Sequence, residues 1–121
     1  MANQPPNAAP SPTQDQVREA FQALYDQLGP AYWAASDINT KDRIYGIEEI
    51  VYDALTQLEQ QQLDANSAMY GQVKIRIQAV LAKIDQLKND IDSIIRAVNV
   101  ATDVAAAADK AIALAGKYFG I

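Results

Sequence analysis

Apolar residues recur every three or four positions along most of the chain, which is the spacing of one face of a helix. The first such stripe consists of Val17, Phe21, Leu24 and Leu28. Thr13 stands three residues before Gln16, as in a capping box. Gly29 and Pro30 follow the stripe, and this pair is typical of a helix end. The pattern therefore predicts a first helix over residues 13–28.

A second stripe follows a short connector that contains Tyr32 and Trp33. It consists of Ile44, Ile47, Val51, Ala54, Leu55 and Leu58. Because Asp37 and Thr40 are both competent N-caps, the pattern predicts a second helix over about residues 38–64. Aromatic side chains in a connector either plug the end of a bundle or contact a partner, and the plug is the more frequent case. Tyr32 and Trp33 are therefore candidate loop contacts, with the plug favoured.

Beyond a run of turn-forming residues at 64–72, the apolar positions alternate between spacings of four and three for six heptads. They are Val73, Ile77, Val80, Ile84, Leu87, Ile91, Ile94, Val98, Ala101, Ala105, Ala108, Ile112, Ala115 and Phe119. This regularity predicts helices over 72–98 and 99–119, either continuous or folded back near Asn99 to Asp103. Because the turn makes the second and third helices an antiparallel hairpin, we expect an all-α bundle of three or four long helices with coiled-coil-like heptads.

The last predicted helix is apolar almost all round, so something must enclose it. A second helix of about 25 residues is roughly 37 Å long and covers the third only to about Val98. The remainder must fold back as a fourth helix, pair with a copy of the chain, or receive a partner. The residues predicted to make that contact are Ala101, Ala105, Ala108, Ile112, Ala115 and Phe119.

A membrane is the other environment that could enclose this helix. Asp109 and Lys110 lie near the middle of the apolar run, and each costs on the order of 2.5–3.5 kcal/mol at the centre of a bilayer. A single spanning helix is therefore disfavoured, whereas an interfacial or oligomeric helix with a wet side remains open. Enclosure by protein is the favoured interpretation.

Composition removes most catalytic and metal-binding chemistry. The chain of 121 residues contains no cysteine and no histidine, so it lacks thiolate ligands and the commonest general base. Glu48, Glu49 and Asp53 are the nearest approach to a metal site, but without the histidines of di-metal bundles a solvated acidic face is the better interpretation. We therefore expect a protein that is not an enzyme and that uses no cofactor and no small-molecule substrate.

The net charge of −5 is unevenly distributed along the chain. Residues 13–66 contain ten acids and three bases, whereas residues 67–121 contain five acids and seven bases. The two halves either attract each other within the bundle or present solvated faces of opposite sign. The basic strip of this acidic chain is modest and consists of Lys74, Arg76, Lys83 and Lys88, so no binding of nucleic acid is expected.

Residues 1–12 contain four of the five prolines and no charged side chain, so we expect a disordered tail before a single helical domain at 13–121. This start has neither the basic region nor the apolar run of a secretory signal peptide. The expected location is cytoplasmic, with secretion by a route that needs no such signal left open.

These observations favour a non-enzymatic helical interaction protein, which would serve as an assembly, adaptor or chaperone-like component. It would act through coiled-coil and alanine-rich contacts with a protein partner or with copies of itself. The alternative is a membrane-active helical protein, such as a component of a secreted α-helical pore-forming system. No motif in the chain points to a known family.

Overall fold

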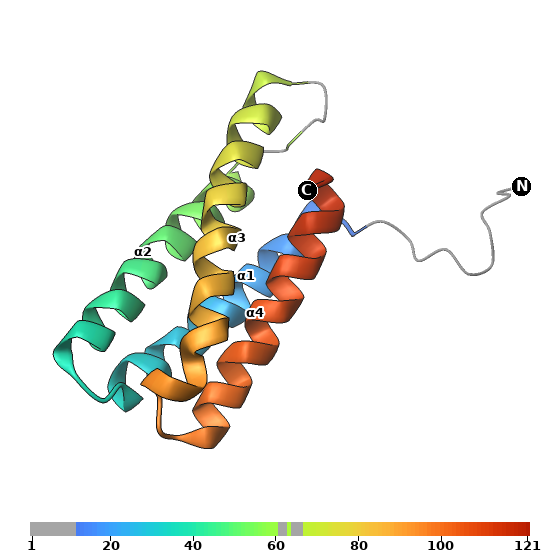
Figure 1. Cartoon of the computed structure of the whole chain (residues 1–121). Coiled ribbons are helices and arrows are strands. Elements are labelled where there is room, and N and C mark those ends of the chain that lie inside the picture. The colour runs from blue at the N-terminus through green and yellow to red at the C-terminus, as the bar shows by residue number, and fades with distance from the viewer. Residues whose placement is uncertain (1–11, 61–62, 64–66) are drawn as a thin grey trace, which may run out of the picture.

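Four helices pack side by side into a bundle (Figure 1). The computed structural model describes residues 12–60, 63 and 67–121, so the predicted tail lies outside the described residues apart from Pro12. The helices are α1 (Gln14–Ala34), α2 (Ile38–Gln60), α3 (Ala68–Ile94) and α4 (Val98–Phe119). Both α1 and α3 pack on α2 and on α4, and within the described ranges the backbones of the two diagonal pairs stay farther apart. The predicted all-α bundle is confirmed.

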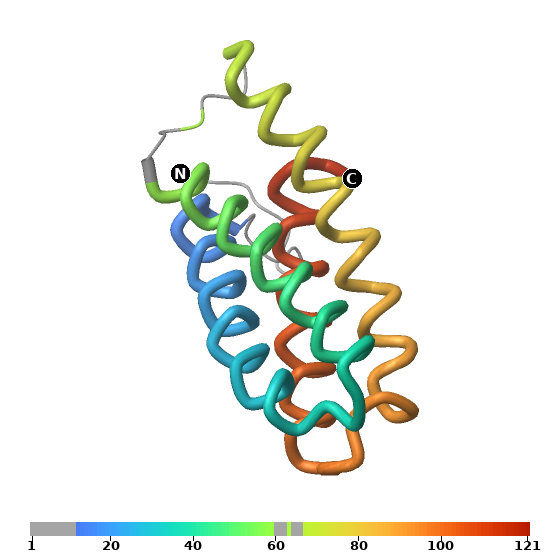
Figure 2. Tube along the Cα trace, turned by 90° about the vertical axis from the view of Figure 1, so that its left-hand side faces the viewer, coloured from blue at the N-terminus to red at the C-terminus, as the bar shows by residue number. Residues whose placement is uncertain are grey.

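The chain runs up and down along successive helices, and the α1–α2 and α3–α4 connections lie at the same end (Figure 2). At that end Ala35 and Ile95 form an antiparallel backbone bridge between the two connections. The break between the last two helices therefore lies at residues 95–97, and α3 and α4 are not continuous. The predicted position of the break, near Asn99 to Asp103, is wrong because those residues belong to α4.

Side-chain caps define where the first three helices begin. The Thr13 hydroxyl accepts a hydrogen bond from the Gln16 N–H at 3.1 Å, and the Gln16 side chain accepts one from the Thr13 N–H at 2.8 Å. The Asp37 carboxylate accepts from the Thr40 N–H at 2.8 Å, and this hydrogen bond lowers the pKa of Asp37. At α3, the Ser67 hydroxyl accepts from the Tyr70 N–H at 3.1 Å. That cap starts α3 at Ala68, four residues before the predicted position.

The prediction that Gly29 and Pro30 end the first helix is wrong, because α1 continues through Pro30 to Ala34. A proline inside a helix costs about 3 kcal/mol. Leu28 and Ala31 on either side of it are fully buried, so the continued turn packs against the core and offsets that cost. The second helix, α2, is described as far as Gln60 at its C-terminal end, and most of its predicted last turn lies outside the described residues.

The core lies along the axis of the bundle and draws on all four helices. In α3 the buried residues are the predicted Val73, Ile77, Val80, Ile84, Leu87 and Ile91. In α4 they are Ala101, Val104, Ala108, Ala111, Ala115 and Phe119, so Val104 and Ala111 replace the predicted Ala105 and Ile112, which are half-buried. Because α4 packs against both α1 and α3, its buried face is turned so that two positions of the stripe, 104 and 111, lie one residue before the predicted ones.

The burial of α4 can be tested with two substitutions two residues apart. Ala108 is 1% exposed and Ala106 is exposed, so Ala108→Glu buries an unpaired carboxylate whereas Ala106→Glu leaves its carboxylate in water. We expect Ala108→Glu to lower the free energy of unfolding by about 3 kcal/mol or more and Ala106→Glu to change it by less than about 0.5 kcal/mol. Urea denaturation measures both, and equal stability of the two variants would contradict the packing of α4.

A second pair of substitutions tests the backbone of two glycines. A Cβ at Gly46, inside α2, would meet nothing within 4 Å, so Gly46→Ala should raise the free energy of unfolding by about 0.5–1 kcal/mol. Gly120 has φ +70° at the end of α4, so Gly120→Ala should lower the free energy of unfolding by about 1 kcal/mol. Thermal unfolding checks the signs, and a destabilised Gly46→Ala variant would show that α2 is packed differently at this point.

Candidate functional site

The six residues predicted to contact a partner or a membrane lie on the core side and flanks of α4. Ala101, Ala108, Ala115 and Phe119 are buried, while Ala105 and Ile112 are half-buried. The bundle itself therefore accounts for the apolar character of α4. A contact role for these residues stays a prediction, since it requires α4 to leave the bundle.

The predicted loop contact, Tyr32 and Trp33, lies instead on the last turn of α1. Trp33 is 78% exposed, so it does not plug the bundle, and its ring meets that of Tyr32 edge to face at 5.2 Å between centroids. The Lys41 ammonium lies over both rings, 5.0 Å from the Tyr32 centroid and 5.5 Å from the Trp33 centroid. It also donates a hydrogen bond to the Tyr32 carbonyl at 2.9 Å. One cation of the chain thus occupies a site made of two aromatic rings.

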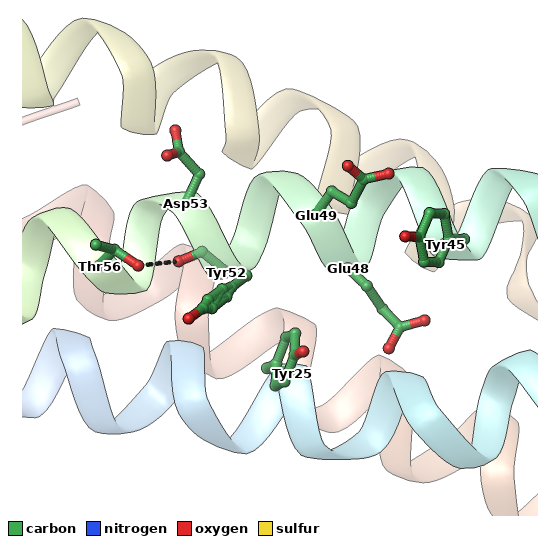
Figure 3. Close-up of a pocket in the computed structure, with 7 residues that line it drawn as sticks. All are labelled: Tyr25, Tyr45, Glu48, Glu49, Tyr52, Asp53 and Thr56. Carbon is green, nitrogen blue, oxygen red and sulfur yellow. Dashed lines mark hydrogen bonds between the residues drawn. The ribbon is translucent and has the colours of Figure 1, made fainter.

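A groove between α1 and α2 brings together tyrosines and carboxylates (Figure 3). Its main hollow has a volume of about 390 Å³ and is lined by Tyr25, Tyr45, Glu48, Glu49, Tyr52, Asp53 and Thr56. A neighbouring hollow of about 170 Å³ shares Tyr25, Tyr52 and Thr56 with it and reaches Gln22 and Glu59. We call these two hollows the tyrosine groove.

Helical spacing places these side chains on one face of α2, beside its buried stripe. Tyr45 and Tyr52 are seven residues apart, which is about 10.5 Å along the helix axis. Tyr45 is 56% exposed and Tyr52 is 53% exposed. Tyr25 of α1 meets the Tyr52 ring edge to face at 5.8 Å between centroids and an interplanar angle of 62°. This contact ties the two walls of the groove together while leaving ring surface open to solvent.

Three carboxylates stand among these rings. Glu48 points toward α1, whereas Glu49 and Asp53 point away from it (Figure 3). Glu48 is half-buried, and this burial raises the pKa of its carboxyl group. Within the described part of the chain, no ion pair or hydrogen bond is recorded for these three carboxylates. Their spread directions fit the finding that no described residues form a cluster able to hold a metal ion.

The bases of the acidic half are engaged elsewhere. Arg18 pairs with Asp15 at 3.0 Å on its own helix, and Lys41 lies on the aromatic pair described above. Arg43 pairs with Asp90 of α3 at 2.9 Å. Among the described residues this is the one ion pair that joins the two halves. In it the acidic half supplies the base and the other half the acid, which is the reverse of an attraction between the net charges of the two halves. The acidic excess of α1 and α2 therefore faces solvent.

Comparison with known protein families, with curated proteins and with solved structures finds no match to this chain. In the described ranges, no helix has the combination of length and apolar character that crossing a membrane requires. The function is therefore inferred from the fold and the groove. Sequence reasoning identified the carboxylates as an acidic face but missed the tyrosines, although the seven-residue spacing of Tyr45 and Tyr52 outside the apolar stripe was a usable sign.

The raised pKa of Glu48 predicts how stability depends on pH. Between the unfolded value of about 4.5 and the raised folded value, the folded state binds more protons than the unfolded state, so stability falls as pH rises through that window. Glu48→Gln should therefore be more stable than the wild type above the window and equally stable below it. Urea denaturation at pH 4 and pH 7.5 measures this, with Glu49→Gln at the exposed neighbouring position as the matched control. A Glu48→Gln variant that is less stable at neutral pH would contradict the assignment.

Proposed function

We propose that this protein is a non-enzymatic helical interaction module that contacts a protein partner through the tyrosine groove. The observation that carries the proposal is the presence, in one groove, of open tyrosine rings beside carboxylates for which the described chain provides no base. Tyrosine is enriched at protein interfaces because its ring offers a large contact area and its hydroxyl a hydrogen bond at little entropic cost. The groove offers both the contact area of exposed rings and the hydrogen-bonding groups of tyrosine.

The bundle would act as a rigid support for this contact. Tyr45 and Tyr52 stand beside the buried stripe of α2, and Tyr25 of α1 packs its ring against the Tyr52 ring. A partner would cover the rings with apolar groups, while the carboxylates would orient its charges and speed the encounter. An assembly, adaptor or chaperone-like role needs no more chemistry than this.

A second candidate, docking on a lipid surface, is favoured by the loop end of the bundle. Trp33, Ile38 and Val98 are all largely exposed there, at the helix ends that flank the two connections joined by the Ala35–Ile95 bridge. Tryptophan and aliphatic side chains at one tip can enter the boundary between headgroups and acyl chains.

On vesicles, Trp33 fluorescence should then shift to shorter wavelength, and Val98→Ser should weaken co-sedimentation. Unchanged emission with both neutral and anionic vesicles would dismiss this candidate.

The proposed contact can be mapped by placing a photo-crosslinking amino acid at position 45 in the cells that produce the protein. The matched control is position 113 on α4, where Ala113 is exposed and lies outside the groove. We expect position 45 to yield a crosslinked protein, and the Tyr52→Ser substitution to reduce that yield because it removes a ring from the groove. Crosslinks from position 113 but none from position 45 would refute the groove as the contact surface.

A further inference from the structure

The contact face already shows how it accommodates a cation. Lys41 lies over the Tyr32 and Trp33 rings, and its Nζ is 2.9 Å from the Tyr32 carbonyl oxygen. Because Lys41 and Tyr45 are four residues apart on α2, this occupied site adjoins the end of the tyrosine groove. Further along the groove, Tyr45 and Tyr52 each stand beside carboxylates without a cation of the described chain. The groove thus offers two further tyrosine rings to a cation, with negative charge beside them.

The flank of α3 next to α2, where Lys83 lines a hollow together with Asp42 and Arg43, has the complementary features. Arg76 and Lys83 are both exposed, and no ion pair in the described part of the chain involves either of them. They are seven residues apart, as Tyr45 and Tyr52 are, so the two cations and the two rings share a spacing of about 10.5 Å. Ile75 and the exposed Ala79 and Ala82 lie beside these two cations, and the small alanine side chains let two helices of another molecule approach closely.

We propose that a second copy of this chain occupies the tyrosine groove, with its α3 lying along the groove. Arg76 and Lys83 of that copy bind beside Tyr45 and Tyr52, where ring faces and the Glu49 and Asp53 carboxylates attract them. The inference rests on the proposed function, since it names the partner of the same groove. Because the groove and the basic strip are different surfaces of one molecule, each copy offers both, and the contact is head to tail and repeats from copy to copy.

Charge decides between this occupant and an anionic one. The groove lies on the acidic half of the chain, so it repels nucleic acid and anionic surfaces, whereas the half that contains α3 has seven bases against five acids. The contact consists mainly of exposed charges and rings, so it is weak and weakens further with salt. Such a contact suits a reversible assembly that forms at high local concentration.

The experiment measures self-association by light scattering and sedimentation equilibrium over a range of concentrations, at low and at high ionic strength. The wild type should associate with increasing concentration at low salt and dissociate at high salt. Arg76→Gln/Lys83→Gln should weaken association about tenfold or more, as should Glu49→Gln/Asp53→Asn. Lys110→Gln/Lys117→Gln is the matched control, because these exposed lysines are also seven residues apart but lie on α4. It should associate like the wild type.

Mixing the two deficient variants gives the sharpest readout. The Arg76→Gln/Lys83→Gln variant keeps an intact groove and the Glu49→Gln/Asp53→Asn variant keeps an intact strip, so the mixture should form a 1:1 dimer that grows no further. A wild type that stays monomeric, equal loss in the α4 control, or a mixture that forms no dimer would each overturn the proposal. If the wild type is monomeric while position 45 still crosslinks a different protein, the proposed function is retained and only the identification of the partner as a second copy is refuted.

Discussion

The packing of α4 against α1 is the interaction on which the rest of the structure depends. Alanines at the buried positions of α4 let the two backbones approach closely, and this is the most extensive of the four helix pairings. Val104, Ala111 and Ala115 are completely buried. Because α4 packs against both α1 and α3, it closes the bundle and completes the core. A helix that is too apolar for water thereby becomes one wall of the core.

Closure of the bundle also determines which surfaces remain for contacts. The alanine-rich side of α4 is buried in the core, and the exposed aromatic surface lies along α1 and α2. Four of the six tyrosines and the only tryptophan lie on these two helices. The bases there are held by Asp15, by Asp90 and by the Tyr32 and Trp33 rings. A groove with negative charge and open rings is the consequence.

The sequence predicted the features that depend on local spacing. The capping box of Thr13 and the buried stripe of α3 follow from residues within a few turns of one another, whereas the fold-back after α3 was only one of the alternatives that the sequence left open. Features that depend on distant contacts were missed. Pro30 lies inside α1 because Leu28 and Ala31 are buried by other helices, and the α3–α4 break is positioned where Ile95 meets Ala35. The tyrosine groove needs Tyr25 from one helix and Tyr52 from another, so the spacing of Tyr45 and Tyr52 could indicate a tyrosine face on α2 but not the groove.

Amide hydrogen exchange of the native protein tests the central claim most directly, because it reports how often each backbone N–H is released from the bundle. The account predicts that the N–H groups of residues 102–119 in α4 exchange as slowly as those of residues 18–29 in α1, through global unfolding alone. Fast exchange throughout α4, with α1 to α3 still protected, would show that α4 leaves a stable three-helix core. The alanine-rich surface would then be available for contacts, and the argument for the tyrosine groove as the main contact surface would fail.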